Sequence, residues 1–418
     1  MGAQERRLKR VEEANFSISW ILICFLSVGN FNPQIFSSVP FVGSVNQFVF
    51  SVVVSLLAAR FILSVNYSFF RRDLIVLILI LSVLSFISFV WSGDPANTLS
   101  KSIVFLFVPF AIAYSIHGLS EREILIGVAI GVGGGLALSL VCILMFPEIA
   151  ARGVVFASMD SWRGAFSQKN VLGRACMIFI CAVFVLMYNR WMSIFSAIVF
   201  LPVAFLLLYK SQSATSVAGV LAFVPLFWAL LTVHRFGRQW LPVVLIVLLT
   251  FGGIFILTID VFIGLFSSAL DKDVSFTGRV PLWSAVLQDW SERPILGFGA
   301  GGYFNELRIA EFTRRLGWDA DNAHNGFLEA LLDVGLLGLL LLIMSIYLLL
   351  RKSIVGFSEG KIAANFVCYI VVILMIQNTM ESAFMRPSNI IWVLFVAACI
   401  NVSDLRKNSV GGQIGKRK

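Results

Sequence analysis

The sequence predicts an all-α polytopic membrane protein, on the basis of its composition, its long apolar runs and the placement of its basic residues. Of the 418 residues, 59% are hydrophobic and 13% are charged, whereas a soluble domain has about 45–50% apolar and about 25% charged residues. The mean hydropathy is +0.91, and Phe alone occurs 39 times. This composition excludes a soluble enzyme, a disordered chain and a coiled coil.

About twelve apolar runs are long enough to cross the roughly 30 Å hydrocarbon core of a bilayer, which takes about 20 helical residues. They cover residues 16–31, 43–64, 73–91, 100–117, 122–147, 170–189, 191–209, 213–233, 240–266, 325–350, 361–383 and 387–402. The first run follows a basic segment, as in a signal peptide, but no small-residue cleavage site comes after it. We therefore expect an uncleaved first helix and a single membrane domain over residues 1–418.

Basic residues predict the orientation of these spans, because Lys and Arg are retained on the cytoplasmic side. The short outer loops hold only Lys101, Lys210 and Arg386, whereas every inner segment carries at least one cation. Both termini are then predicted to be cytoplasmic. The formal net charge of +9 is concentrated on the inner side, so it marks topology and does not indicate a nucleic-acid partner.

Two long outer loops, at 148–169 and 267–324, depart from this pattern because they carry several cations. In the second loop, Ser275 and Thr277 are positioned to cap a short amphipathic helix that begins near Arg279. Its Trp residues predict a helix at the membrane surface. The glycine run at 297–302 follows no strand, so we expect a tight turn before a second helix at about 303–315, and not a nucleotide-binding loop.

A histidine near the end of this loop is the main candidate for acid–base chemistry. His324 is followed by Asn325 and Glu329, with Asp333 one helical turn further on. An imidazole, with an ordinary pKa of about 6.5, can accept a proton at neutral pH. A helix-capping or interfacial histidine remains the alternative. The six cysteines all fall within predicted helices and form no CxxC pair, so they predict core residues and neither a disulfide framework nor a metal site.

Four motifs occur in order along the predicted outer face. They are Arg163-Gly164-Ala165-Phe166-x-x-Lys169-Asn170-x-x-Gly173, Phe276-Thr277-Gly278-Arg279 with Trp283, Pro294-x-x-Gly297-x-Gly299, and Ala323-His324-Asn325-Gly326-Phe327-Leu328-Glu329 followed by Gly335-Leu336-x-Gly338. Together they resemble the O-antigen ligase and polymerase superfamily, and their form is closer to that of its exopolysaccharide polymerases of the succinoglycan type.

This resemblance implies a GT-C-like glycosyltransferase of the bacterial inner membrane that acts on its periplasmic face. The donor would be an undecaprenyl-pyrophosphate-linked glycan, the acceptor another glycan, and no cofactor or metal would take part. A polymerase would join lipid-linked repeat units, whereas a ligase would pass the glycan to lipid A core. Membrane lipids are expected around the chain, and a flippase and a chain-length regulator are expected partners by analogy.

The resemblance also implies roles for particular residues. Arg163 and Arg279 would hold the pyrophosphate, for which a bidentate guanidinium is well suited, and His324 would be the base. Further substrate-binding residues would be Lys169, Asn170, Asn325 and Glu329. Many relatives carry a Ser-Arg pair at the start of a mid-chain helix, where this chain has Ser211-Gln212. Lys210 is the secondary candidate to supply the missing cation.

A transporter or flippase is the alternative from another functional class. Transporters usually bury ionisable groups at mid-membrane. Here Arg60 and Asp260, two of the charges within predicted spans, lie toward the span ends.

Overall fold

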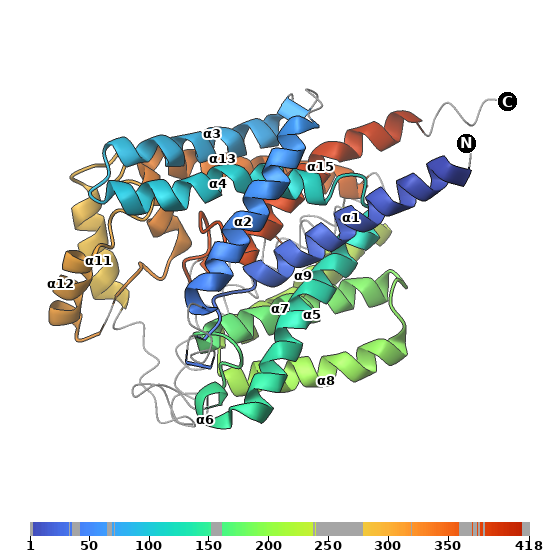
Figure 1. Cartoon of the computed structure of the whole chain (residues 1–418), viewed down its shortest axis with the longest axis horizontal. Coiled ribbons are helices and arrows are strands. Elements are labelled where there is room, and N and C mark those ends of the chain that lie inside the picture. The colour runs from blue at the N-terminus through green and yellow to red at the C-terminus, as the bar shows by residue number, and fades with distance from the viewer. Residues whose placement is uncertain are drawn as a thin grey trace. The chain divides into compact units, whose positions relative to one another are not determined.

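The computed structural model is built from α-helices (Figure 1). It describes residues 3–32, 34–35, 42–64, 69–70, 72–151, 161–236, 239, 279–318, 320–358, 370, 374, 377–378 and 381–411. The helices are α1 (Ala3–Ser27), α2 (Val42–Leu63), α3 (Asp73–Ile87), the short 3-10 helix η2 (Ser88–Val90), α4 (Pro95–Ser115), α5 (Glu121–Met145), α6 (Pro147–Ala150), α7 (Lys169–Tyr188), α8 (Ile194–Ser211), α9 (Ala214–Phe236), α11 (Arg279–Trp290), α12 (Glu306–Leu316), α13 (Gly326–Ser358) and α15 (Ile390–Gly411).

Seven of the described helices are long and apolar enough to cross a membrane, and three shorter apolar helices accompany them at Ala14–Ser27, Ala214–Phe223 and Ile390–Ser403. The chain is therefore a multi-pass membrane protein. Of the predicted spans, 240–266 lies outside the described residues, as does most of 361–383. Cys24, Cys142, Cys176, Cys181 and Cys399 are buried free thiols, as predicted for core residues, while Cys368 lies outside the described part of the chain.

The structure divides into two compact units, which are described separately. The first comprises residues within 1–65, 107–221 and 387–393. In it α1 packs on α2 and α5, α5 packs on α7, and α7 packs on α8. Helix α7 is surrounded by protein along most of its length, whereas α8 exposes much of its apolar surface, as lipid-facing helices do.

Glycines on α5 allow α1 to approach closely. A side chain at Gly127 would collide with the indole of Trp20, and one at Gly131 would meet the Cys24 side chain and the backbone of Ile21. The Trp20 Nε1–H then donates to the Ile124 carbonyl at 2.9 Å. Small residues at such spacing let membrane helices pack backbone to backbone, where the hydrophobic effect supplies little attraction.

Replacing Gly131 by leucine should therefore separate α1 from α5 and lower the stability of the first unit. We expect a loss of about 1–3 kcal/mol, typical of overpacking, measured as a lower thermal unfolding midpoint of the purified protein in detergent. Ile130→Leu is the control, because Ile130 is 52% exposed on the same helix. Equal midpoints for the two variants would contradict the close packing.

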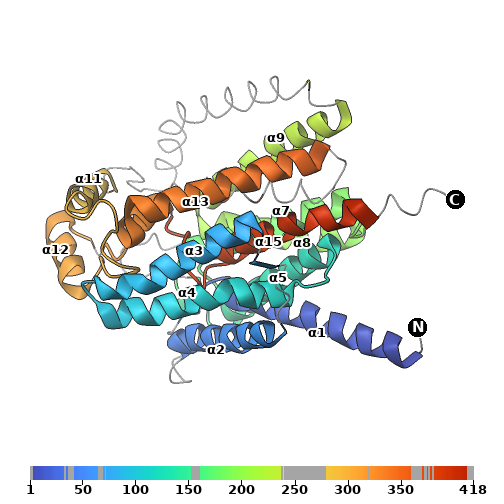
Figure 2. The same ribbon diagram turned by 90° about the horizontal axis from the view of Figure 1, so that it is seen from above.

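The second unit comprises residues within 66–106, 222–386 and 394–418. Helix α3 packs along α13 (Figure 2), and α11 packs on α13 and on α12. The two predicted loop helices are thus present, as α11 and α12. The side chain of Asn305 caps α12 by accepting from the Arg308 amide at 2.9 Å, and Gly317 ends the helix in the left-handed region.

Much of the apolar face of α11 is covered by protein. Leu282 and Val286 are buried in a small core with Tyr303 and Phe312. Trp283 donates its indole N–H to the Ala323 carbonyl at 2.8 Å. An amphipathic pattern is satisfied equally by lipid or by protein, and here the neighbouring helices α12 and α13 supply the apolar partner.

Candidate functional site

His324 lies in the segment that joins α12 to α13, in the second unit. Its neighbour Asn325 begins α13, because the Asn325 Oδ1 accepts from the amides of Phe327 at 3.0 Å and Leu328 at 3.2 Å. These bonds satisfy two amides that the first helical turn leaves unpaired. Asn325 therefore fixes the start of the helix, and with it the position of the preceding histidine.

The backbone of His324 is held in an uncommon conformation. Its φ is +48°, in the left-handed region, which costs free energy for a residue with a Cβ. The His324 amide donates to the Asn322 Oδ1 at 2.8 Å, and the imidazole lies beside the Trp318 ring with centroids 5.6 Å apart. The Nδ1 atom is buried and has no hydrogen-bond partner among the described residues. The ring therefore has an unused buried nitrogen.

The surroundings of this imidazole favour its neutral form. Burial lowers the pKa of His324, and the charge of Arg279 lowers it further, while Glu381, Asp321 and Glu329 act in the opposite direction. Arg279 is the first residue of α11 and lies 3.9 Å from the Glu381 carboxylate, with its side chain 27% exposed. Burial lowers the pKa of Arg279 as well, but a guanidinium remains charged at any physiological pH. A neutral imidazole and a fixed cation thus lie near each other.

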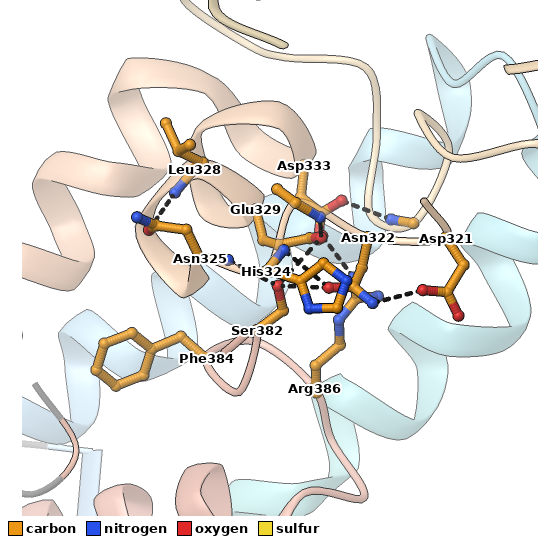
Figure 3. A network of polar contacts seen from close by, with 12 residues as sticks. Asp321, Asn322, His324, Asn325, Leu328, Glu329, Asp333, Ser382, Phe384 and Arg386 are labelled. Atoms are coloured by element: carbon orange, nitrogen blue, oxygen red, sulfur yellow. Dashed lines mark hydrogen bonds and ion pairs between the residues drawn. The ribbon is translucent and has the colours of Figure 1, made fainter. Parts of the chain in front are cut away.

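A buried carboxylate organises the segment around His324 (Figure 3). Glu329 forms an ion pair with Arg386 and accepts from the Ala323 amide at 2.6 Å. Ser382 donates its hydroxyl to the Asn322 Oδ1 at 3.1 Å and also lies 3.3 Å from Glu329. Asn322 and Ala323, which precede His324, are therefore tied through Ser382 and Glu329 to the segment 381–386.

Helix α13 is broken at Gly335, and the segment around the glycine run of the large loop supplies hydrogen-bond partners to the backbone on both sides of the break. Gly335 has φ 65° and ψ −167°, a backbone region open essentially to glycine. Beyond the break, the amide of Leu336 donates to the Pro294 carbonyl at 2.8 Å; before it, the Leu332 carbonyl accepts from Phe298 at 2.7 Å. Backbone groups freed inside a membrane helix must find such partners. The predicted tight turn is therefore also hydrogen-bonded to α13.

The glycine run also contacts Asp333, two residues before the break at Gly335. The Gly301 amide donates to the Asp333 Oδ1 at 2.7 Å, and the Lys101 ammonium lies against Gly301. The Asp333 carboxylate is thus engaged by the backbone amide of Gly301. No group of three or more His, Cys, Asp or Glu side chains suited to a metal ion occurs in the described part of the chain.

Comparison with known proteins points to one family. The sequence profile of the family described as O-Antigen ligase matches residues 197–343. The chain is also 27% identical over 282 residues to exopolysaccharide production protein ExoQ of Rhizobium meliloti (strain 1021), an alignment that spans 63% of this chain and 61% of ExoQ. The resemblance to the O-antigen ligase and polymerase superfamily is confirmed. The alignment leaves more than a third of each protein uncovered.

The O-antigen ligase match includes Lys210, Arg279, His324, Asn325 and Glu329, and it ends within α13. Arg163, Lys169 and Asn170 precede the matched range, and Arg386 follows it. The structure brings Arg279, His324, Asn325 and Glu329 together in the second unit. The other four predicted residues lie in the first unit.

Arg163 lies in a turn that is tied to α6 within the first unit. The amides of Arg163 and Gly164 both donate to the Ala150 carbonyl at 3.0 Å. The Arg163 guanidinium donates from Nε to the Ile149 carbonyl at 2.9 Å and from an Nη to Gln34 at 3.2 Å. Burial lowers the pKa of Arg163. The guanidinium is therefore oriented by neutral acceptors and keeps its full charge.

Lys210 lies beside the same turn. Its carbonyl accepts from the Trp162 amide at 2.8 Å, and its ammonium lies over the Trp162 ring, 5.5 Å from the centroid. Lys169 and Asn170 open α7 and are partly buried, each with its own contacts. The first unit thus gathers the predicted residues Arg163 and Lys210 on adjoining segments.

Sequence reasoning did not identify Asn322, Ser382 or Arg386 as part of the histidine site. One signal was present, because Arg386 is among the few cations in the predicted short outer loops, where Lys and Arg are depleted. Its buried partner explains the exception. The Glu329 carboxylate raises the pKa of Arg386, so this cation is held by a specific acid and not by the membrane surface.

Proposed function

We propose that the chain is a bacterial inner-membrane glycosyltransferase that polymerises undecaprenyl-pyrophosphate-linked oligosaccharide repeat units on the periplasmic face. The observation that carries the proposal is the pairing of His324, whose imidazole is kept neutral and has a buried nitrogen without a partner among the described residues, with the partly exposed guanidinium of Arg279. The family match and the name of ExoQ support the same chemistry.

In the proposed reaction, an acceptor hydroxyl attacks the anomeric carbon of the donor glycan. The new glycosidic C–O bond forms as the bond from the anomeric carbon to the pyrophosphate oxygen breaks, and the leaving oxygen keeps the electron pair. His324 takes the hydroxyl proton. Arg279 stabilises the charge that develops on the pyrophosphate. The products are an elongated glycan and free undecaprenyl pyrophosphate.

Arg163 is proposed as a second cation for the pyrophosphate, with Lys210 beside its turn. Lys169, Asn170 and Asn325 are proposed to bind the substrate. For Glu329 we propose a supporting role, because its carboxylate is almost fully buried and is already engaged by Arg386 and Ala323. The termini are proposed to be cytoplasmic, following the distribution of basic residues.

A ligase that passes the glycan to lipid A core is the second candidate, and the description of the matched family favours it. The two functions differ in what accumulates when the gene is deleted. Loss of a polymerase leaves single capped repeats, whereas loss of a ligase leaves long polymer on the lipid carrier. Electrophoresis of glycans and of lipid-linked intermediates from a deletion strain separates the two.

Replacing Arg279 by alanine should lower the rate of glycan transfer about 10²–10³-fold, as loss of one electrostatic stabiliser does. Arg279→Lys should recover only part of the rate, because an ammonium lacks the bidentate fork. The readout is polymer length in the complemented deletion strain and transfer rate in proteoliposomes. Arg315→Ala is the control, since Arg315 is 57% exposed. Full activity of a correctly inserted Arg279→Ala variant would refute the assigned role.

A further inference from the structure

Five carboxamide side chains gather where the end of α1, the start of α2 and the Arg163 turn meet within the first unit. Every second residue from position 30 to position 34 carries one, namely Asn30, Asn32 and Gln34, and Asn46 and Gln47 follow on α2. We refer to these five residues as the amide cluster. Asn30, Gln34 and Gln47 are exposed, whereas Asn32 and Asn46 are buried.

Backbone bonds hold the amide cluster against the Arg163 turn. The Asn32 amide donates to the Ala165 carbonyl at 2.8 Å, and the Ser167 amide donates to the Asn30 carbonyl at 2.9 Å. Phe31 stacks on Phe166 with ring centroids 6.1 Å apart. The segment 30–34 is therefore fixed beside the turn, and Gln34 reaches the Arg163 guanidinium at 3.2 Å.

Hydrogen bonds within the amide cluster leave part of its capacity unused. Gln47 donates to the Asn30 Oδ1 at 3.1 Å, and Asn46 donates to the Gly29 carbonyl at 2.9 Å. In the buried layer, the Asn32 Nδ2 and the Asn46 Oδ1 have no partner among the described residues. A buried polar group without a partner costs about 1–3 kcal/mol, so a donor and an acceptor remain for an incoming polar group or a water molecule.

The chemistry of the cluster selects the class of ligand. A carboxamide offers both a donor and an acceptor and carries no charge, which matches neighbouring hydroxyl groups on a neutral ring better than it matches a phosphate. The adjoining Arg163 supplies the positive charge that a phosphate needs. A ligand that combines a hydroxyl-rich ring with a phosphate fits both parts.

We propose that the amide cluster is a saccharide subsite, which binds the sugar residues attached to a pyrophosphate held at Arg163. The inference rests on the proposed function, because it takes the lipid-linked glycan as the substrate. Asn30 and Gln47 contact the sugar hydroxyls from the surface, Gln34 bridges to Arg163, and Asn32 and Asn46 support the exposed amides. The subsite then contributes to sugar selectivity.

The test compares two lipids that differ only in the sugar. Wild-type protein and a Gln47→Ala variant are placed in nanodiscs, and binding is measured for bare undecaprenyl pyrophosphate and for the undecaprenyl-pyrophosphate-linked oligosaccharide isolated from the deletion strain. Gln47 is exposed and its side chain bonds to Asn30, so the variant should fold. Gln288→Ala, the same change at an exposed position of α11, is the matched control.

We expect Gln47→Ala to weaken binding of the glycosylated lipid about 5–10-fold, the effect of losing one hydrogen bond, and to leave binding of the bare lipid unchanged. Combining it with Asn30→Ala should weaken glycolipid binding further. Unchanged binding of the glycolipid, or an equal loss for both lipids, would overturn the subsite and leave water as the occupant of the buried layer. If wild-type protein bound neither lipid, the proposed function itself would fail, and the subsite with it.

Discussion

Replacing His324 by alanine is expected to lower the rate of glycan transfer about 10²–10⁴-fold, the usual contribution of a general base. The reason is that the imidazole is the group kept neutral beside a fixed cation, with a buried nitrogen that bonds to nothing described. Transfer from purified lipid-linked donor in proteoliposomes measures the rate. Binding of undecaprenyl pyrophosphate should persist in the variant, because His324 is not assigned to the pyrophosphate.

The pH dependence of the same reaction gives a second readout of His324. Its pKa is lowered below the ordinary value of about 6.5, so the base stays neutral at pH 7 and the rate should fall only as the pH drops through that lowered value. Asp321 raises the pKa of His324. Asp321→Asn should therefore move the acid limb to lower pH, with the rate at pH 8 unchanged. An acid limb above pH 6.5 in wild-type protein would contradict the assignment.

Breaking the ion pair between Glu329 and Arg386 should have the second large effect. Removing one partner of a buried pair typically costs about 3–5 kcal/mol, and the Glu329 side chain is 2% exposed while Arg386 is 27% exposed. We expect Arg386→Ala to cost near the lower end of that range, about 3 kcal/mol. The measurement is the thermal unfolding midpoint of purified protein, and the matched control is the exposed pair of Arg315 with Glu311, where Arg315→Ala should cost less than about 1 kcal/mol.

A double variant distinguishes an ion pair that only stabilises the fold from one that also positions His324. Glu329→Gln combined with Arg386→Gln leaves no unpaired charge, so most of the stability should return. The Ala323 amide and Ser382 would still have an acceptor in the new carboxamide. If the pair acts by positioning His324, transfer should stay reduced at temperatures where the double variant is fully folded. Full activity there would reduce the pair to a structural role.

Part of this site could be predicted from local sequence, and part could not. His324 was predicted from its residue type and its place in the loop, whereas Arg279 and Asn325 were predicted from the resemblance to the O-antigen ligase and polymerase superfamily. Arg386 lies 57 residues from Glu329, and no periodicity relates the two positions. Ser382 and Asn322 could not be predicted for the same reason, because the bond between them joins segments that are distant in the sequence.

Composition and long apolar runs were enough to predict a chain of apolar helices, because a chain in hydrocarbon must satisfy its backbone within each span. The sequence also located the charged loops that carry the candidate residues. Three features could be seen only after folding: α11 buries Leu282 and Val286 in protein, the 325–350 run breaks at Gly335, and residues 294–301 bond to the backbone on both sides of that break. Each of these depends on which distant segment supplies the apolar surface or the hydrogen-bond partner, and hydropathy along the chain does not indicate that segment.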